Sequence, residues 1–370
     1  MSLINRISVI TLAAINPVSM DLLAPAIPYF QKVLPALDGQ VFFSTYLTGL
    51  AAGQFIGAFL LNGRRSAFWA LLFCLVYCVS SLIVGISCSD QTFLLSRFVT
   101  GFSAGIVYLF CMLLISNSDS EDEIAENYRL RNQALLYVAA LIPFVSAIVI
   151  SASSFQYLVT LQVVYGVLCF LLITGFIRSP LAGRTAVKKR ESISRGGLIS
   201  NLASMLCWSA MLYFLLSLIP DFFSKVSPHP EWMICAGIAI SALFYRLGSF
   251  LKNRISDAHR SFVCVVLIGF FILAHYNSAT AVKFSLLGAG YFAAGVYQSR
   301  AAAKVLSSSA FSSRRNTSLL TFLNLLLSAL IVELARRLGV TDALTWFGIP
   351  LTLFALIPLW QNRKQMRLVT

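Results

Sequence analysis

Charged residues are scarce in this chain of 370 residues. Only 11% of its residues are Asp, Glu, Lys or Arg, 58% are hydrophobic, and the mean hydropathy is +0.81. Soluble domains carry about 25% charged residues, so this composition excludes an ordinary soluble protein. The apolar runs are about 20 residues long, the length of a membrane-spanning helix. They lack the short alternating pattern of a membrane β-barrel. The sequence therefore predicts an all-α membrane protein with many spans.

Groups that serve enzymes and metal sites are also missing. The chain has three histidines, and most of its eight cysteines lie within apolar runs, without CxxC or Cys/His metal spacing. It has no Ser/His/Asp set, no His/Glu metal pair and no phosphate-binding glycine loop. We therefore expect no enzymatic activity, no disulfide, no metal, no cofactor, and no ATP-driven transport within this chain.

Twelve apolar segments follow one another along the chain. We expect spans at about 6–29, 41–61, 67–87, 92–115, 131–151, 157–177, 198–219, 232–251, 261–276, 283–303, 317–336 and 344–360. The first run carries Asp21 and three prolines, and no Ala-x-Ala site follows it. We therefore interpret it as the first span rather than as a cleaved signal peptide.

The net charge of +14 comes from basic residues in alternate loops. One set of loops contains Arg64-Arg65, the segment from Arg178 to Arg195 and the C-terminal run from Arg363 to Arg367, whereas the other set contains few basic residues. Lys and Arg are enriched in cytoplasmic loops. We therefore expect both termini in the cytoplasm, and no nucleic-acid partner.

The longest connection divides the spans six and six. It predicts an N-terminal six-helix bundle over residues 1–177, a basic cytoplasmic linker over 178–197, and a C-terminal six-helix bundle over 198–370. Two bundles of equal size are typical of transporters built from repeats, with the substrate site between them.

One carboxylate interrupts the first apolar run, in the stretch Asp21-Leu-Leu-Ala-Pro25-Ala-Ile-Pro28. A charge inside a membrane costs about 2.5–3.5 kcal/mol on insertion scales and marks a functional site by default. Pro25 removes a backbone hydrogen bond, so the helix should be kinked or open just beyond Asp21.

Arg97 in the fourth span is the expected partner of Asp21. Asp21 lies roughly 22 Å along a helix that rises from one face, and Arg97 roughly 8 Å along a helix that descends from the other. These depths coincide in a hydrocarbon core about 30 Å thick. The geometry allows an ion pair, direct or through water. The alternative is that Arg97 snorkels to the interface.

Three stretches resemble motifs of the major facilitator superfamily, in its bicyclomycin-resistance-type drug:proton antiporter branch. The stretch from Asp21 to Pro28 resembles the first-helix motif D-x-Y-L-P-A-L-P. The second-helix motif G-F-A-x-G-Q is similar to Gly49-Leu-Ala-Ala-Gly53-Gln54, and the fourth-helix motif R-F-x-Q-G-x-x-A to Arg97-Phe-Val-Thr-Gly101-Phe-Ser-Ala-Gly105. These glycines also predict close helix packing.

Two stretches depart from the family pattern. The loop Gly57-Ala-Phe-Leu-Leu-Asn-Gly-Arg64-Arg65 is short and lacks the family's Asp. The fifth-helix motif Pro-x-x-Gly-Pro-x-x-Gly reads Pro143-Phe-Val-Ser146-Ala147-Ile-Val-Ile150, with small residues but no glycines.

The resemblance implies the major facilitator fold: a monomeric carrier in a bacterial inner membrane that uses a proton gradient to move a small molecule by alternating access. It implies a proton-coupling role for Asp21 with Arg97, and a fixed structural pair is the alternative. Cavity-lining helices of this family imply substrate contacts for Tyr46, Gln54, Tyr108, Tyr137, Trp208 and Tyr213, and Arg300 is a candidate contact for an anionic substrate.

Three functions remain open at this point. The first is export of a small organic compound, a drug or an endogenous metabolite such as a siderophore, in exchange for protons. The second is a uniporter or importer of a small metabolite on the same fold. The third is a membrane sensor that transports nothing.

Overall fold

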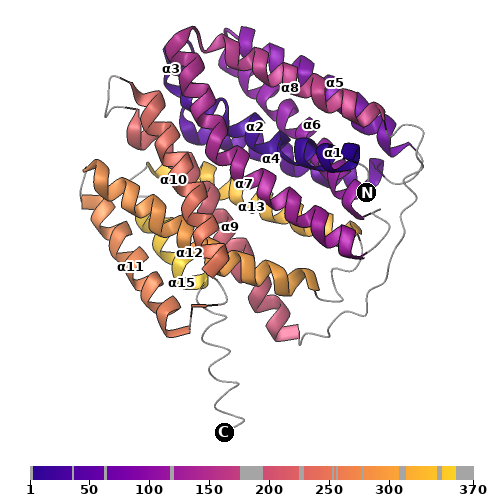
Figure 1. Cartoon of the computed structure of the whole chain (residues 1–370). Coiled ribbons are helices and arrows are strands. Elements are labelled where there is room, and N and C mark those ends of the chain that lie inside the picture. The colour runs from indigo at the N-terminus through magenta and orange to yellow at the C-terminus, as the bar shows by residue number, and fades with distance from the viewer. Residues whose placement is uncertain are drawn as a thin grey trace.

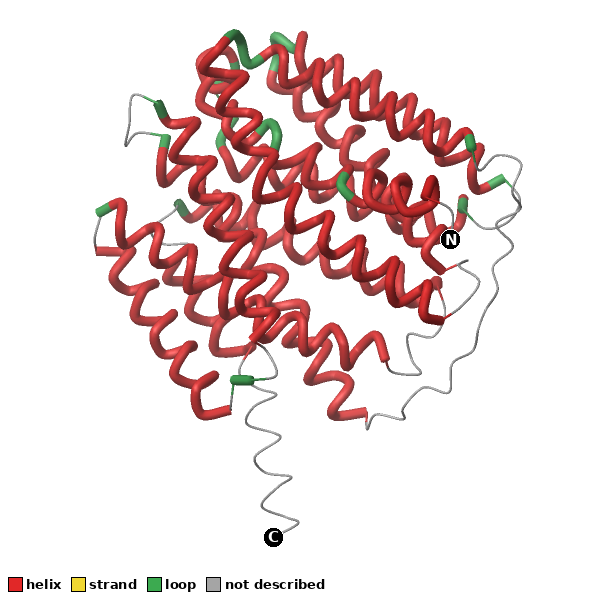
Figure 2. Tube along the Cα trace, viewed as in Figure 1, coloured by secondary structure: helices red, strands yellow, loops and turns green. Residues whose placement is uncertain are grey.

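Every element of the described residues is a helix, as Figures 1 and 2 show. The computed structural model describes residues 3–35, 37–61, 65–116, 121–175, 195–224, 229–251, 254–255, 257–276, 279–307, 314–339 and 344–355. Most of the predicted linker 178–197 therefore lies outside the described residues, as do Arg64 and the basic C-terminal run. The two domain boundaries stay a prediction.

The first predicted span consists of four short pieces. They are α1 (Leu3–Ala13), α2 (Ile15–Asp21), the 3-10 turn η1 (Ala24–Ala26) and α3 (Ile27–Val33). The first half continues with α4 (Gly39–Leu60), α5 (Ser66–Ile86), α6 (Asp90–Ser116), α7 (Glu121–Ala152) and α8 (Gln156–Thr174). The second half holds α9 (Arg195–Phe223), α10 (Pro230–Leu251), α11 (Asp257–Tyr276), α12 (Thr280–Ser307), α13 (Arg314–Leu338), η3 (Leu344–Gly348) and α15 (Ile349–Ala355).

Nine helical segments of the described residues are long and apolar enough to cross a membrane. They comprise the composite first segment Arg6–Val33, the helices α4 to α10, and α13. The apolar part of α11, Val263–Leu273, is shorter, and neither α12 nor the η3–α15 segment is among the nine. The structure thus confirms an all-helical, multi-pass membrane protein, and the number twelve stays a prediction.

Glycines hold two pairs of helices backbone to backbone. A Cβ atom at Gly49 of α4 or Gly101 of α6 would overlap a main-chain carbonyl of the partner helix. The same holds at Gly248 of α10 and Gly295 of α12. In the predicted order of spans, α4 and α6 are the second and fourth, and α10 and α12 are the eighth and tenth. The second and fourth spans of each half therefore make the same close contact. This correspondence supports a structural repeat, as in transporters built from two related bundles.

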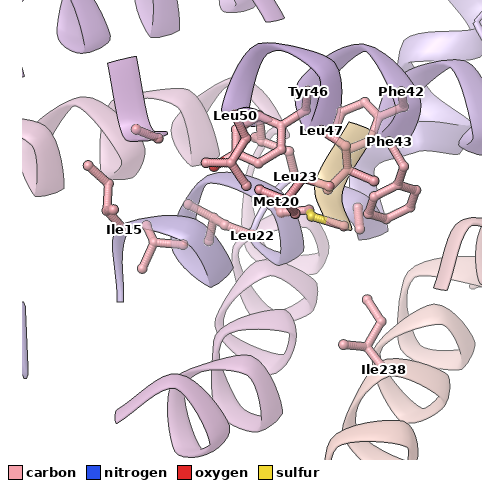
Figure 3. Packing of buried hydrophobic residues seen from close by; sticks show 14 of the residues in the cluster. Ile15, Met20, Leu22, Leu23, Phe42, Phe43, Tyr46, Leu47, Leu50 and Ile238 are labelled. Carbon is pink, nitrogen blue, oxygen red and sulfur yellow. The ribbon is translucent and has the colours of Figure 1, made fainter. Parts of the chain in front are cut away.

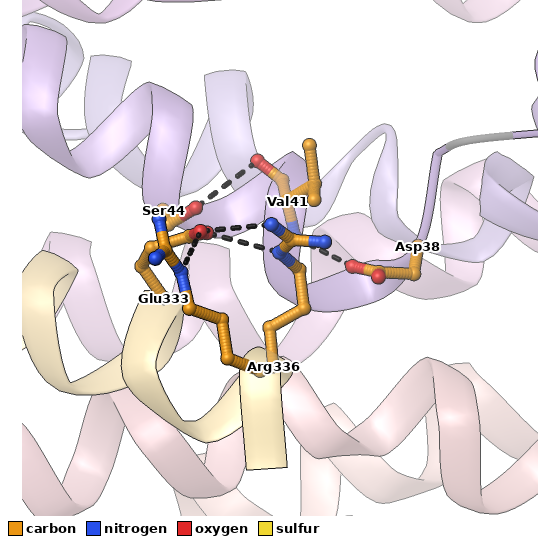
Figure 4. Close-up of polar contacts among 6 residues, drawn as sticks. Asp38, Val41, Ser44, Glu333 and Arg336 are labelled. Atoms are coloured by element: carbon orange, nitrogen blue, oxygen red, sulfur yellow. Dashed lines mark hydrogen bonds and ion pairs between the residues drawn. The ribbon is translucent and has the colours of Figure 1, made fainter. Parts of the chain in front are cut away.

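The two halves meet along two seams. Helix α4 packs against α13 on one side, and α7 packs against α10 on the other. We call the end of the bundle where α1 begins the inner end, and the end where α3 ends and α10 begins the outer end. At the outer end η1 contacts α10, and Gly39 of α4 lies against Ser217 and Pro220 of α9. Figure 4 shows the outer ends of α4 and α13 side by side.

Candidate functional site

The first span is broken directly after Asp21. Helix α2 ends at Asp21, the 3-10 turn η1 contains Pro25, and α3 begins at Ile27. The prediction of a helix opened just beyond the carboxylate is therefore confirmed, for the expected reason that proline provides no N–H for the helical ladder.

A side chain from another helix compensates for this break. The amide of Ala26 donates to the Leu23 carbonyl at 3.0 Å, which leaves the Leu22 carbonyl without its helical partner. Ser146 of α7, fully buried, donates its hydroxyl to that carbonyl at 2.5 Å. Figure 3 shows Leu23 packed beside the aromatic residues of α4. Ser146 belongs to the stretch Pro143–Ile150, which departs from the family motif, and its hydrogen bond stabilises the break in the first span.

Asp21 is buried, with 6% of its surface exposed. Among the described residues, no hydrogen bond or ion pair joins its carboxylate. The carboxylate lies within electrostatic range of three phenol groups: Tyr46 of α4, Tyr213 of α9 and Tyr291 of α12. Because these tyrosines come from both halves, Asp21 lies at the junction between them.

Arg97 is fully buried on α6 but does not contact Asp21. Its Nη1 donates to the Ser19 carbonyl at 2.9 Å, and its guanidinium carbon lies 4.1 Å from the ring centre of Phe42 and 4.7 Å from that of Tyr46. Its Nε and Nη2 have no hydrogen-bond partner among the described residues.

The expected direct ion pair is therefore wrong, and so is the snorkelling alternative for Arg97. Depth along two helices says nothing about direction around them. Arg97 uses a main-chain carbonyl of α2 as its partner instead of the carboxylate two residues further on. The guanidinium reaches the Ser19 carbonyl, and its titratable neighbours are Tyr46 and Tyr77 rather than Asp21.

The other predicted site residues fall into two groups. Tyr46 and Tyr213 lie near Asp21, and Tyr108 of α6 is within electrostatic range of Tyr213. Gln54 is buried on α4, two turns from Tyr46. The structure therefore brings part of the predicted substrate set together around the carboxylate.

Among the described residues, no hydrogen bond, ion pair or ring contact joins the remaining predicted residues to the carboxylate. Trp208 is fully buried and stacks on Tyr297, with 4.9 Å between ring centres. Tyr137 is 52% exposed and lies beneath Arg246, whose guanidinium carbon is 5.3 Å from its ring centre. Arg300 of α12 has a buried Nη1 without a hydrogen-bond partner among the described residues.

Several polar residues of the second half were missed by the sequence analysis. Tyr291 donates to the Leu212 carbonyl at 3.0 Å. Tyr245 of α10 donates to Gln298 of α12 at 3.1 Å, and the Gln298 amide donates to Ser209 of α9. Polar residues inside apolar runs were the available signal, because such groups need partners in a membrane.

The comparisons with known proteins agree with this architecture. No family model matches the chain. The multidrug resistance protein MdtL of Salmonella typhimurium is 24% identical over 300 residues, which cover 76% of this chain and 75% of that protein. The same protein of Salmonella paratyphi B also matches with 24% identity over 300 residues and the same coverage.

Two solved structures share the fold over nearly the whole chain. A D-xylose-proton symporter matches with a TM-score of 0.71 and 13% identity, over 96% of this chain and 97% of that one. A bacterial homologue of the human lysosomal transporter Spinster matches with a TM-score of 0.65 and 12% identity, over 96% and 95%. The chain therefore has the major facilitator fold of these transporters, and it is similar in sequence to multidrug resistance proteins.

Proposed function

We propose that the protein exports a small organic compound from a bacterial cytoplasm in exchange for protons. The observation that carries this proposal is Asp21, a buried carboxylate without a partner among the described residues, placed at a helix break between the halves. Burying an ionised carboxylate without a partner is costly. Such a group therefore binds a proton readily, and releases it when water or a substrate stabilises its charge.

Arg97 has an anchoring role in this proposal. It connects α6 to the Ser19 carbonyl, two residues before Asp21, and the rings of Phe42 and Tyr46 hold its guanidinium in place. A change at the carboxylate would therefore reach α6 through α2. Tyr46, Tyr213 and Tyr291 place aromatic rings with polar hydroxyls near Asp21, a combination that suits an amphipathic substrate. The carrier is proposed to work as a monomer, with both termini in the cytoplasm and no cofactor besides the proton gradient.

The similarity to multidrug resistance proteins supports the choice of assay. A pump-deficient strain that expresses the chain is compared, over a panel of antibiotics and dyes, with strains that carry Asp21→Asn or no transporter. Compounds that the wild-type chain protects against are then followed in inverted membrane vesicles with an imposed pH gradient. We expect gradient-driven uptake by the wild type and its loss in Asp21→Asn.

The control is Asp90→Asn, the same change of acid to amide in the first turn of α6, outside the site. It should transport as the wild type does. Equal transport with and without the gradient would instead identify a facilitator. Uptake in the opposite direction would identify an importer, and gradient-driven transport that survives Asp21→Asn would refute the role of Asp21.

A further inference from the structure

A groove runs between α5 and α6 in the outer part of the first half. Its walls come from residues 75–83 of α5 and 92–99 of α6, and its volume is about 400 Å³. Pockets that hold small ligands have volumes of about 300–1,000 Å³. Six of the nine side chains that line the groove are Val, Leu or Ile, and the other three are Ser80, Thr92 and Ser96. The groove is therefore large enough for a ligand and mostly aliphatic.

The hydroxyl groups of the lining already have partners within the protein. Ser80 donates to the Tyr77 carbonyl at 3.1 Å, and Ser96 donates to the Thr92 carbonyl at 2.8 Å. The Thr92 hydroxyl accepts from Ser89 at 2.8 Å. A buried water needs two to four polar partners, and a polar ligand needs groups that fix its orientation. The lining thus favours hydrocarbon over water or a polar compound.

The groove follows the outer leaflet of the membrane. Both α5 and α6 are among the membrane-spanning helices, and at the outer end α5 ends at Ile86 and α6 begins at Asp90. At 1.5 Å per residue, the lining extends from roughly 3–5 Å to roughly 14–17 Å below these helix ends. One leaflet contributes about 15 Å to a hydrocarbon core of about 30 Å. The groove therefore has the depth and direction of a lipid acyl chain.

The open side of the groove faces the bilayer. Leu75, Val79 and Leu95 at its rim are 50%, 57% and 66% exposed. Helix α5 packs chiefly against α6 and α8, whereas the seams between the halves are formed by α4 with α13 and by α7 with α10. A ligand therefore reaches the groove from the lipid, and not from the junction that holds Asp21.

We propose that this groove binds one acyl chain of an outer-leaflet phospholipid. Lipid tails are as apolar as the groove, so transfer from bulk lipid supplies no driving force. The gain comes from packing, because an unfilled groove forfeits the dispersion contacts of its lining atoms, and a chain inside it is contacted on several sides. The bound chain braces α5 against α6, the helix that carries Arg97. The site depends neither on proton coupling nor on the direction of transport.

Photocrosslinking from a lipid chain tests this proposal. The full chain is reconstituted in vesicles of phosphatidylethanolamine and phosphatidylglycerol that contain a small fraction of a phospholipid with a diazirine in the middle of one acyl chain. After irradiation, peptide mass spectrometry measures the adducts on each segment. The reference is the lipid-facing surface of α8, where Tyr157, Val164 and Leu171 are 58%, 59% and 60% exposed. Groove residues should be labelled about fivefold more than this surface, because a chain in the groove makes more contacts.

Two variants fill the groove from opposite walls. Val76→Phe on α5 and Val99→Phe on α6 each place a ring where the chain would lie, so labelling of the groove should fall to the level of the α8 surface. Either variant tests the proposal if the other misfolds. The matched control is Val164→Phe, the same substitution on the lipid-facing surface of α8, eight residues from its outer end. It should leave labelling of the groove unchanged.

Equal labelling of the groove and the α8 surface in the wild type would overturn the proposal, since the groove would then hold only exchanging bulk lipid. Enrichment that survives both Val76→Phe and Val99→Phe would also overturn it. A free fatty acid with the same diazirine that labels the groove while the phospholipid does not would identify a different occupant. So would displacement of the label by a transported compound, and either result would refute the assignment to a phospholipid. None of these measurements depends on Asp21, so the failure of this proposal can be told from the failure of the proposed function.

Discussion

Whether Asp21 and Arg97 act as a pair or separately can be measured with a double-mutant cycle. The variants are Asp21→Asn, Arg97→Met and the combination of both. In the structure Arg97 donates to the Ser19 carbonyl and lies over two rings, and no contact joins it to Asp21. We therefore expect the two free-energy changes to be nearly additive.

The magnitudes separate the two arrangements clearly. If the two groups formed a buried ion pair, removing either one would cost about 3–5 kcal/mol because the other charge would be left unpaired. The double variant would then recover most of that loss. In the structure, Asp21→Asn removes a charge without a partner and should be neutral or stabilising. Arg97→Met loses a charged hydrogen bond of about 1.5–3 kcal/mol and two ring contacts of about 0.5–2 kcal/mol each.

Part of that loss is returned, because a buried cation no longer has to be desolvated. We therefore expect Arg97→Met to lower the free energy of unfolding by roughly 2–4 kcal/mol, and the coupling to stay below about 1 kcal/mol. A small coupling is allowed because Tyr46 is close to both groups. The measurement is unfolding by SDS in mixed micelles, followed by tryptophan fluorescence. A coupling above about 2 kcal/mol would refute the separate arrangement.

Three further predictions concern stability. Ser146→Ala leaves the Leu22 carbonyl without its donor, so the free energy of unfolding should fall by about 1–3 kcal/mol in the same assay. An unchanged value would contradict the conclusion that the Ser146 hydroxyl stabilises the break. Gly105→Ala should cost about 1–3 kcal/mol because its Cβ would lie 2.5 Å from a main-chain oxygen of α4, whereas Gly269→Ala, with open space around it, should not destabilise. Burial raises the pKa of Asp38 in the folded protein, so the free energy of unfolding should fall as the pH rises from about 4 through that pKa. The variant Asp38→Asn keeps an N-cap but cannot ionise. It should therefore flatten the pH dependence of thermal unfolding between about pH 4 and 8.

The sequence alone predicted structure correctly at positions where the residue type has a single backbone consequence, as proline and glycine do. Pro25 lacks an N–H, so the break beyond Asp21 could be predicted from the chain alone. Glycines at Gly49 and Gly101 allow two backbones to meet, and the structure places a carbonyl where each Cβ would be. The apolar runs identified the membrane class for the same reason, because their length must match the bilayer.

Contacts between distant segments could not be predicted in this way. The depth argument for Arg97 used one dimension, and the direction of its side chain is set by Phe42 and Tyr46 on a third helix. Tyr213 and Tyr291 approach Asp21 from the second half, and no local pattern marks that approach. Tyr137 is on a helix of the site but contacts Arg246 of α10, because residues on one helix face different directions.

Helix α7 contacts both the break in the first span and the beginning of α10. Its Ser146 holds the break beside Asp21, and its Ser151 and the Pro143 carbonyl hold the first two turns of α10. The first contact lies within one half and the other two lie between halves. Separation of α10 from α7 at the outer end would therefore keep the Ser146 hydrogen bond to the break, whereas η1 would lose its contacts with α10. Opening of that end would change the surroundings of Asp21 while the break itself persists, and such a change is what lets a buried carboxylate bind a proton on one side and release it on the other.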